Sequence, residues 1–286
     1  MTQKKSNTDG AMQFFLPYTE HFKSILDRAV FYANGEGYPE VSGGRAPENA
    51  HLLERQELHE LAETLGPRFQ WAANSTCSVY TSDVKEMLHR VSVNGGSVTV
   101  ADYKFAHRIK KDFPDIRLAA SCIMALSTDF EKIRSSGIFE HIITPQFWNY
   151  DFDKLELLDN KEELVTIVNS TCDHAEDPKR CYRHYDYNSK MYRPPPHENI
   201  SKDWAEKCEY CRYMTMSGKL LAILRKDTLA DKWAMYKKYK PEKFPPWETV
   251  IQELSTRGFK SFKFQGRAFA SLKEWAEPII RFVEAH

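Results

Sequence analysis

Four of the six cysteines lie in one region of the chain, with a spacing that suits metal ligands. Cys172 and Cys181 have eight residues between them, and Cys208 and Cys211 form a C-x-x-C pair. In a reducing compartment such cysteines are more often metal ligands than disulfides. Four thiolates suit either a tetrahedral zinc ion or an iron–sulfur cluster, so we take all four as candidate ligands.

The first cysteine pair favours one of these metals. Zinc knuckles use short spacings in both halves of the site, whereas eight residues separate Cys172 from Cys181. An iron–sulfur cubane is larger and tolerates irregular spacing, so we expect a cluster, with Zn²⁺ or unligated thiols as the alternatives. Cys77 and Cys122 lie at expected strand ends. Each is interpreted as a small buried residue, with replacement of one of the four ligands as the alternative.

Short β-rich runs alternate with amphipathic helical stretches along the chain, which predicts a parallel sheet with helices outside it. The expected strands cover 12–18, 38–44, 68–76, 97–102, 116–124, 141–146, 164–171 and 259–266. The expected helices cover 19–35, 47–65, 81–92, 103–113, 126–137, 152–160 and 270–284.

Eight such units fit an α/β fold of one particular kind, a single (β/α)8 TIM-like barrel. An open doubly wound sheet is the structural alternative. We expect residues 1–10 to be a disordered tail and 11–286 to form one barrel domain. The connection between the seventh and eighth strands is unusually long and holds all four candidate ligands, so 172–254 is predicted to be a metal-binding insertion.

In a β/α barrel, functional residues gather at the carboxyl ends of the strands. Reading those ends along the sequence gives a mostly polar, short-chained set, as expected of a ligand-lined mouth. The candidate substrate-binding residues are Arg45, Asn74, Gln146 and Arg267, and the candidate catalytic residues are His184, Asn169 and Asp102.

Arg45 and Arg267 each follow glycine, in Gly-Gly-Arg and Gly-Arg. Glycine lets the backbone approach a ligand, and arginine offers a planar fork for a carboxylate or phosphate. Two such arginines predict an anionic small-molecule ligand, although each arginine would also suit a local carboxylate or helix cap. His184 suits proton transfer near the metal, or an ordinary structural hydrogen bond.

The overall charge of the chain points to no particular partner. Lys plus Arg equals Asp plus Glu, 40 each, so no global field favours nucleic acid or an anionic membrane. No apolar run is long enough to span a bilayer, and no signal segment is evident. We therefore expect a cytoplasmic protein without a membrane span.

Three segments resemble the collagenase-like peptidase U family 32. VNSTCDHAEDPKRCYRHYD (168–186) resembles its cysteine signature, and FKSFKFQGRAFASLKEWAEPIIRFV (259–283) its closing strand and helix. The stretch 97–127 resembles its middle strand–helix–strand block. This sequence differs from the family in the wider first cysteine pair and the tight C-x-x-C of the second.

The resemblance implies a barrel with a [4Fe–4S] cluster held by four cysteines, of which Cys172 and Cys181 carry over most directly. Several members of the family look like oxygen-independent hydroxylases of RNA bases or ubiquinone precursors, and some take the oxygen atom from the dicarboxylate prephenate. The two arginines would suit such an anionic oxygen donor. The size of this chain is closest to members that work with a heteromeric partner.

Three functions therefore compete. The first is an iron–sulfur oxidoreductase that hydroxylates or otherwise modifies a small molecule or nucleobase. The second is a protein that binds RNA, single-stranded DNA or a partner protein and has a structural four-cysteine metal site. It is suggested by 232–244 and 257–267, which interleave aromatic and basic residues. A peptidase is third, since the sequence contains neither HExxH nor GxSxG.

Overall fold

The computed structural model describes residues 29–33, 37–42, 53–145, 148, 151–168, 186, 245–263, 280–282 and 284–285. These residues fall into two compact units. The first holds the described residues up to Ile143 together with Asp186, and the second holds those from Thr144 to Val168 and from residue 245 onward.

Parallel strands alternate with helices in both units, which confirms the predicted α/β class. In the first unit β1 (Phe31–Ala33), β2 (Phe69–Ala73), β3 (Ser97–Val100), β4 (Arg117–Ala120) and β5 (His141–Ile143) pair in parallel, each with the next. In the second unit β6 (Leu164–Ile167) pairs in parallel with β7 (Ser261–Lys263). Within each unit the strands follow one another in sequence order, β1-β2-β3-β4-β5 and β6-β7, as expected of successive β/α units, and closure into an eight-stranded barrel stays a prediction.

Except for the last, the helices lie close to their predicted positions. In the first unit they are α2 (Arg55–Leu65), α3 (Ser82–Val93), α4 (Tyr103–Asp112) and α5 (Phe130–Ser135), with 3-10 turns η3 (Gly66–Arg68) and η4 (Met124–Leu126). In the second unit they are α6 (Phe152–Glu156), η6 (Lys161–Glu163) and α10 (Trp247–Thr256). The last of these covers the end of the predicted insertion, directly before the final strand.

Side-chain caps explain where several helices begin. Thr81 accepts a hydrogen bond from the Val84 N–H at α3, and Asp102 accepts from the N–H groups of Lys104 and Phe105 at α4. Asp129 and Asp151 cap α5 and α6 in the same way. Each cap satisfies backbone donors that the first helical turn leaves unpaired. Asp or Thr at each of these four positions therefore marks the start of a helix.

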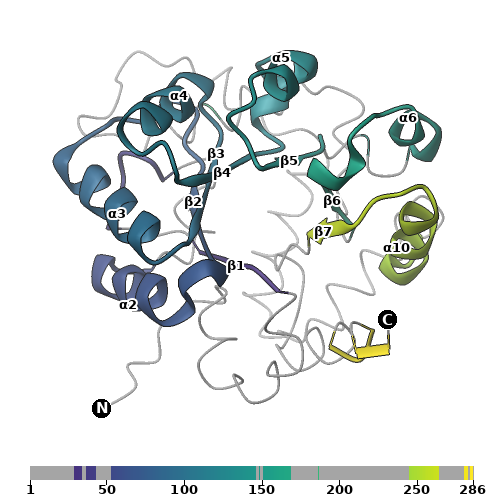
Figure 1. Cartoon of the computed structure of the whole chain (residues 1–286), viewed down its shortest axis with the longest axis horizontal. Coiled ribbons are helices and arrows are strands. Elements are labelled where there is room, and N and C mark those ends of the chain that lie inside the picture. Colours follow the sequence, from purple (N-terminus) through teal and green to yellow (C-terminus); the bar gives the residue numbers. More distant parts are fainter. Residues whose placement is uncertain are drawn as a thin grey trace, which may run out of the picture. The chain divides into compact units, whose positions relative to one another are not determined.

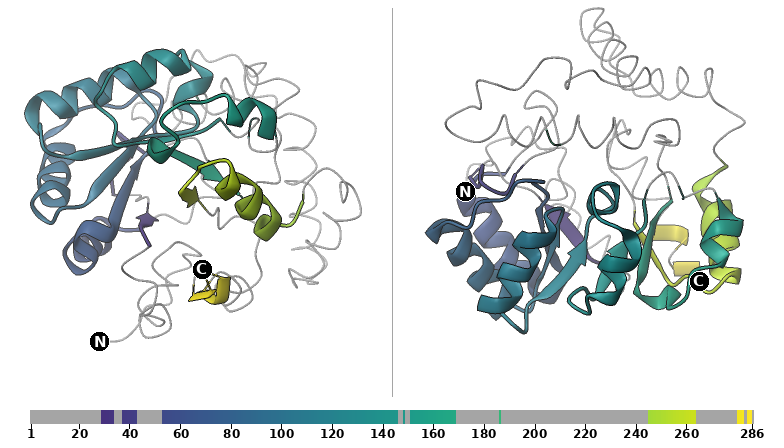
Figure 2. Two further views of the ribbon diagram at one scale, coloured as in Figure 1. Left: turned by 45° about the vertical axis from the view of Figure 1, so that its right-hand side comes forward. Right: turned by 90° about the horizontal axis from the view of Figure 1, so that it is seen from above.

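Helices α2, α3 and α4 cover one face of β1–β4 (Figure 1 and Figure 2). The parallel register places Trp71, Val98 and Leu118 side by side in one row, and all three are fully or almost fully buried. Trp71 contacts Tyr38, which bonds to His59 of α2, so this row faces the helices. The apolar core of the first unit lies between this face and the helices.

The first strand differs from the prediction. A helix was expected over 19–35, yet residues 31–33 form β1. A strand was expected over 38–44, yet the described part of it is a turn, in which the N–H groups of Val41 and Ser42 both bond to the Tyr38 carbonyl. Pro39 has no N–H to give to a ladder, and the local bonds use the donors that follow it. The strand expected over 12–18 lies outside the described residues.

Arg117 connects the amino ends of three strands through hydrogen bonds. It opens β4, and its guanidinium donates to the carbonyls of Pro67 and Gly95, both at 2.6 Å. These carbonyls belong to the connections that enter β2 and β3. Glu140 lies 3.7 Å from the same guanidinium. A charged donor thus satisfies two backbone acceptors that no strand ladder uses.

We expect Arg117→Ala to lower the free energy of unfolding by about 1–3 kcal/mol, because two carbonyls lose a charged donor. Urea unfolding followed by circular dichroism measures this. Glu140→Gln is the control: it removes only the longer ion pair and should change stability by less than about 1 kcal/mol. Equal losses in the two variants would contradict the role given to the backbone bonds.

Candidate functional site

The carboxyl ends of β2, β3 and β4 carry a group of small polar side chains, all in the first unit. Parallel pairing brings these three ends to one edge of the sheet. In an α/β sheet this edge is where ligands bind. The residues that follow the three strands are Asn74, Ser75, Thr76, Cys77, Asp102, Ser121 and Cys122.

Ser75 organises the loop after β2. It is 1% exposed, and its N–H donates to the Val41 carbonyl at 2.8 Å, which joins this loop to the turn over 37–42. Its Oγ accepts from the Cys77 N–H at 3.3 Å and lies 3.6 Å from the Cys77 Sγ. The Cys77 thiol is therefore held beside a hydroxyl at the strand end.

Thr76 makes the contact that spans the greatest distance along the sequence in this group. Its Oγ1 donates to Oδ1 of Asp186 at 2.7 Å, across 110 residues of sequence. Asp186 is 8% exposed, so this is a hydrogen bond to a buried carboxylate. Asp186 closes the segment CYRHYD, which contains Cys181 and His184. A described residue of the cysteine-bearing region thus lies at the carboxyl end of β2.

Asn74 is the first residue after β2 and the one predicted substrate-binding residue that the structure describes. Its Oδ1 is buried and makes no hydrogen bond with any described group. An amide oxygen without a partner costs free energy unless a water molecule or a ligand completes it. The Asn74 oxygen is therefore a hydrogen-bond acceptor that no described group uses.

The ends of β3 and β4 are joined by backbone and side-chain contacts. The Ser121 N–H donates to the Val100 carbonyl at 2.8 Å, and Ser121 Oγ accepts weakly from the Ile123 N–H at 3.4 Å. Cys122 is half-buried and packs against the small apolar cluster of Ala101 and Ile123. These contacts position the Ser121 hydroxyl at the same edge as Asn74.

Asp102, predicted to be catalytic, caps α4. Both of its backbone bonds, from Lys104 at 2.9 Å and Phe105 at 3.1 Å, go to Oδ1. The cap fixes the carboxylate at the carboxyl end of β3, where the prediction placed it. Any direct role in chemistry would fall to Oδ2, which neither bond uses.

Most of the predicted site lies outside the described residues. Asn74 and Asp102 are described, and the structure brings them to one sheet edge. No group of three or more metal-ligating side chains occurs among the described residues, and none of the four predicted ligands is among them. The predicted residues outside are Arg45, Gln146, Asn169, His184, Arg267, Cys172, Cys181, Cys208 and Cys211.

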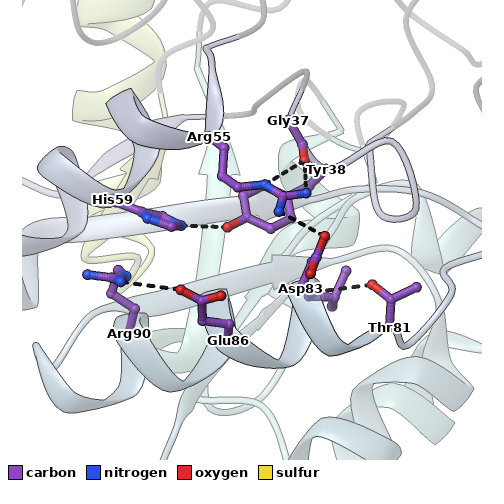
Figure 3. Close-up of polar contacts among 9 residues, drawn as sticks. Gly37, Tyr38, Arg55, His59, Thr81, Asp83, Glu86 and Arg90 are labelled. Atoms are coloured by element: carbon purple, nitrogen blue, oxygen red, sulfur yellow. Dashed lines mark hydrogen bonds and ion pairs between the residues drawn. The ribbon is translucent and has the colours of Figure 1, made fainter.

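A buried tyrosine anchors the turn over 37–42 that meets the loop after β2 (Figure 3). Tyr38 is 1% exposed, its hydroxyl lies 2.6 Å from His59 Nε2, and its ring meets Trp71 edge-on at 5.1 Å. Arg55 lies over the same ring at 4.9 Å. The Glu40 and Val41 carbonyls of this turn accept hydrogen bonds from the loop after β2, so the anchor supports the strand-end group.

Arg55 links this turn to two helices (Figure 3). Its Nε and Nη2 donate to the Gly37 carbonyl at 3.3 and 3.0 Å, and its Nη1 lies 2.8 Å from the carboxylate of Asp83 on α3. A Cβ on Gly37 would come within 2.7 Å of the Arg55 backbone, so only glycine fits this approach. One guanidinium thus connects the turn, α2 and α3.

Burial changes the titration of the Tyr38–His59 pair. It raises the pKa of Tyr38 to about 12, a shift partly opposed by Arg55. Burial also lowers the pKa of His59, helped by the nearby cations Arg90 and Arg55 and opposed by Glu86 and Glu63. Both groups are therefore neutral at pH 7, with the hydroxyl and imidazole sharing a hydrogen bond.

Sequence reasoning missed the residues that act through contacts distant in sequence. The Thr76–Asp186 bond joins two residues that no local pattern relates. Thr99 was missed as well: it is fully buried within β3, and its hydroxyl has no partner among the described residues. A polar residue inside the apolar run SVTV was the available signal, because a buried hydroxyl needs a partner.

Comparison with known proteins identified no relative. No family model, no curated protein and no solved structure matches this chain. Among the described residues, no helix is long and apolar enough to cross a membrane. The case for a function therefore depends on the chemistry of the chain itself.

The lowered pKa of His59 predicts a loss of stability in mild acid. As the pH falls below about 6.5, the unfolded chain takes up the proton before the folded one, so folding becomes less favourable. We expect His59→Gln, which keeps a hydrogen-bonding partner for Tyr38, to lose less stability between pH 7 and pH 5 than the wild type. Urea unfolding at both pH values measures the difference, and parallel losses would show that His59 does not titrate in this way.

Proposed function

We propose that this chain is an iron–sulfur-dependent oxidoreductase that modifies a small molecule or a nucleobase, with oxygen-independent hydroxylation as the favoured reaction. Cys172, Cys181, Cys208 and Cys211 would hold a [4Fe–4S] cluster. Four thiolates are the usual ligand set of such a cluster, and the long first spacing suits it better than zinc. When bound, the cluster would transfer electrons or bind the substrate.

The observation that carries the proposal is the hydrogen bond between Thr76 and Asp186. It attaches a residue of the cysteine segment to the carboxyl end of β2, five positions after Cys181 and two after His184. A buried carboxylate is costly without a partner, so this bond favours one placement of the segment over others. The bond thus brings Asp186, which follows the first cysteine pair in the sequence, to the strand-end group of the first unit.

The strand-end residues suit the binding of a polar substrate. Asn74 offers an uncompleted amide, and Ser121 offers a hydroxyl at the same edge. Arg45 and Arg267 would supply the positive charge for an anionic substrate or oxygen donor. His184 and Asn169 would lie near the cluster, where His184 can take up or release a proton at ordinary pH.

Iron and sulfide analysis of protein purified without oxygen tests the proposal. We expect about four iron and four sulfide per chain and a brown colour that bleaches in air. Cys172→Ala and Cys208→Ala should each lower the iron content strongly, since a cubane needs all its thiolates. A colourless sample with zinc, or full iron content in either variant, would contradict the proposal.

The Thr76–Asp186 bond can be tested in the same assay. Thr76→Val removes the bond with little change in side-chain volume, so we expect lower iron content and faster bleaching in a folded protein. Ser78→Ala is the matched control, because among the described residues its hydroxyl bonds only to the nearby Ser75 carbonyl, at 3.1 Å. Equal iron content in both variants would separate the Thr76 bond from the metal site.

Nucleic-acid binding with a structural four-cysteine site is the second candidate, and one described feature favours it. Helix α4 carries Lys104, Arg108, Lys110 and Lys111 against the single acid Asp112, which already pairs with Lys85 at 3.4 Å. Lys104 and Lys111 are exposed and have no acidic partner among the described residues. By contrast, Arg55 and Arg90 on the neighbouring helices pair with carboxylates.

Single-stranded RNA binding distinguishes this candidate. If α4 binds phosphates, the double variant Lys104→Ala/Lys111→Ala should weaken binding of oligouridine and reduce the salt slope by about 1.4. Lys154→Ala/Lys161→Ala is the control with the same charge change, since these lysines lie over Trp148 and Phe259. Fluorescence anisotropy at several salt concentrations measures both, and equal effects would exclude a specific role for α4.

A further inference from the structure

We infer that the Thr99 hydroxyl and the Asn74 carboxamide form a binding site for a neutral amide-like group, with an N–H beside a C=O, on the β2–β3 face opposite the helices. The inference rests on the proposed function for the identity of the reaction. The site itself is inferred only from the register of the strands and the burial of the two side chains.

The register places the two side chains on one face of the sheet. Thr99 pairs with Ala72 on β2 and Ala119 on β4, in the row opposite to that of Trp71. Asn74 follows Ala72 by two positions and so continues the same face beyond the end of β2. From strand geometry the two Cα atoms are about 8 Å apart, near enough for one small group to reach both side chains.

The polar groups of this face fall into two sets. Those near the amino ends are paired: Gln70 donates to Ser97 at 3.3 Å, and Arg117 donates to two carbonyls. Those nearer the carboxyl ends are not, because Thr99 Oγ1 and Asn74 Oδ1 are buried without partners among the described residues. Unused hydrogen-bonding capacity thus lies at the end of the strands where ligands bind.

Thr99 is the stronger of the two indications. It is 0% exposed, and a buried hydroxyl without a partner costs about 1–3 kcal/mol. Valine has the same shape and would avoid this cost at a position that otherwise reads as an apolar strand. Its neighbours in the row, Ala72 and Ala119, are both small.

The charges at this edge favour a neutral group over an anion. Thr99 and Asn74 are uncharged, and the carboxylate of Asp186 is held on Thr76, two residues beyond Asn74. A hydroxyl can donate to a carbonyl, and an amide oxygen accepts from an N–H. A group with an N–H beside a C=O meets both needs.

Two lactams test the inference on the full chain purified without oxygen. 2-Pyrrolidone carries an N–H beside its C=O, and N-methyl-2-pyrrolidone lacks the N–H. We expect 2-pyrrolidone to raise the thermal midpoint with a dissociation constant roughly fivefold to tenfold lower than that of the N-methyl compound. This preference should disappear in Asn74→Ala, which removes the acceptor of the N–H. Thr99→Val should weaken the binding of both lactams alike, because both carry the C=O that the hydroxyl would bind, whereas Thr99→Ser, which keeps the hydroxyl, should bind both as the wild type does.

Equal stabilisation by the two lactams, or unchanged binding of both in Thr99→Val, would overturn the inference. So would a Thr99→Val midpoint well below that of the wild type, since the hydroxyl would then already be paired in the resting protein. Iron analysis of the same samples separates the two proposals. A lactam preference without iron would leave this site standing and refute the cluster, and iron without a preference would do the reverse.

Discussion

Parallel pairing of β2, β3 and β4 is the constraint on which the candidate site depends. Because the three strands run in the same direction, the residues that follow them share one edge, although they lie far apart in the sequence. The helix caps, the loop around Ser75 and the Asn74 amide oxygen, which has no partner among the described residues, take their positions from this pairing. At the opposite edge, Arg117 binds the connections that enter β2 and β3.

Much of the described fold was predictable because it is built from local signals. Strands are indicated by the runs SVTV and RLAA, and helix starts are indicated by the caps Thr81 and Asp102. The first strand was not predictable in this way. Helical spacing continues through residues 22–30 into Phe31–Ala33, and only pairing with β2 makes that end of the run a strand.

The candidate site was predictable in part for the same reason. Asn74 and Asp102 were found because strand ends can be read from the sequence. The partner of Thr76 was not, because its hydrogen bond reaches a residue 110 positions away. Tyr38 was read as part of a strand, whereas its ring packs between Arg55 and Trp71 and supports a turn. Contacts of this kind depend on the tertiary fold, which spacing alone does not contain.

The bond between Thr76 and Asp186 also sets an order of events during synthesis. Strands β2 to β4 and their helices are complete in sequence long before residue 186 leaves the ribosome, and each can form from contacts close along the chain. The hydrogen bond from Thr76 can form only after Asp186 has been synthesised. Forming it closes the long segment between these two residues, which costs entropy that the earlier steps avoid. Because the first unit includes Asp186, it is discontinuous in the chain. We therefore expect its strand-end site to form later than the sheet that supports it.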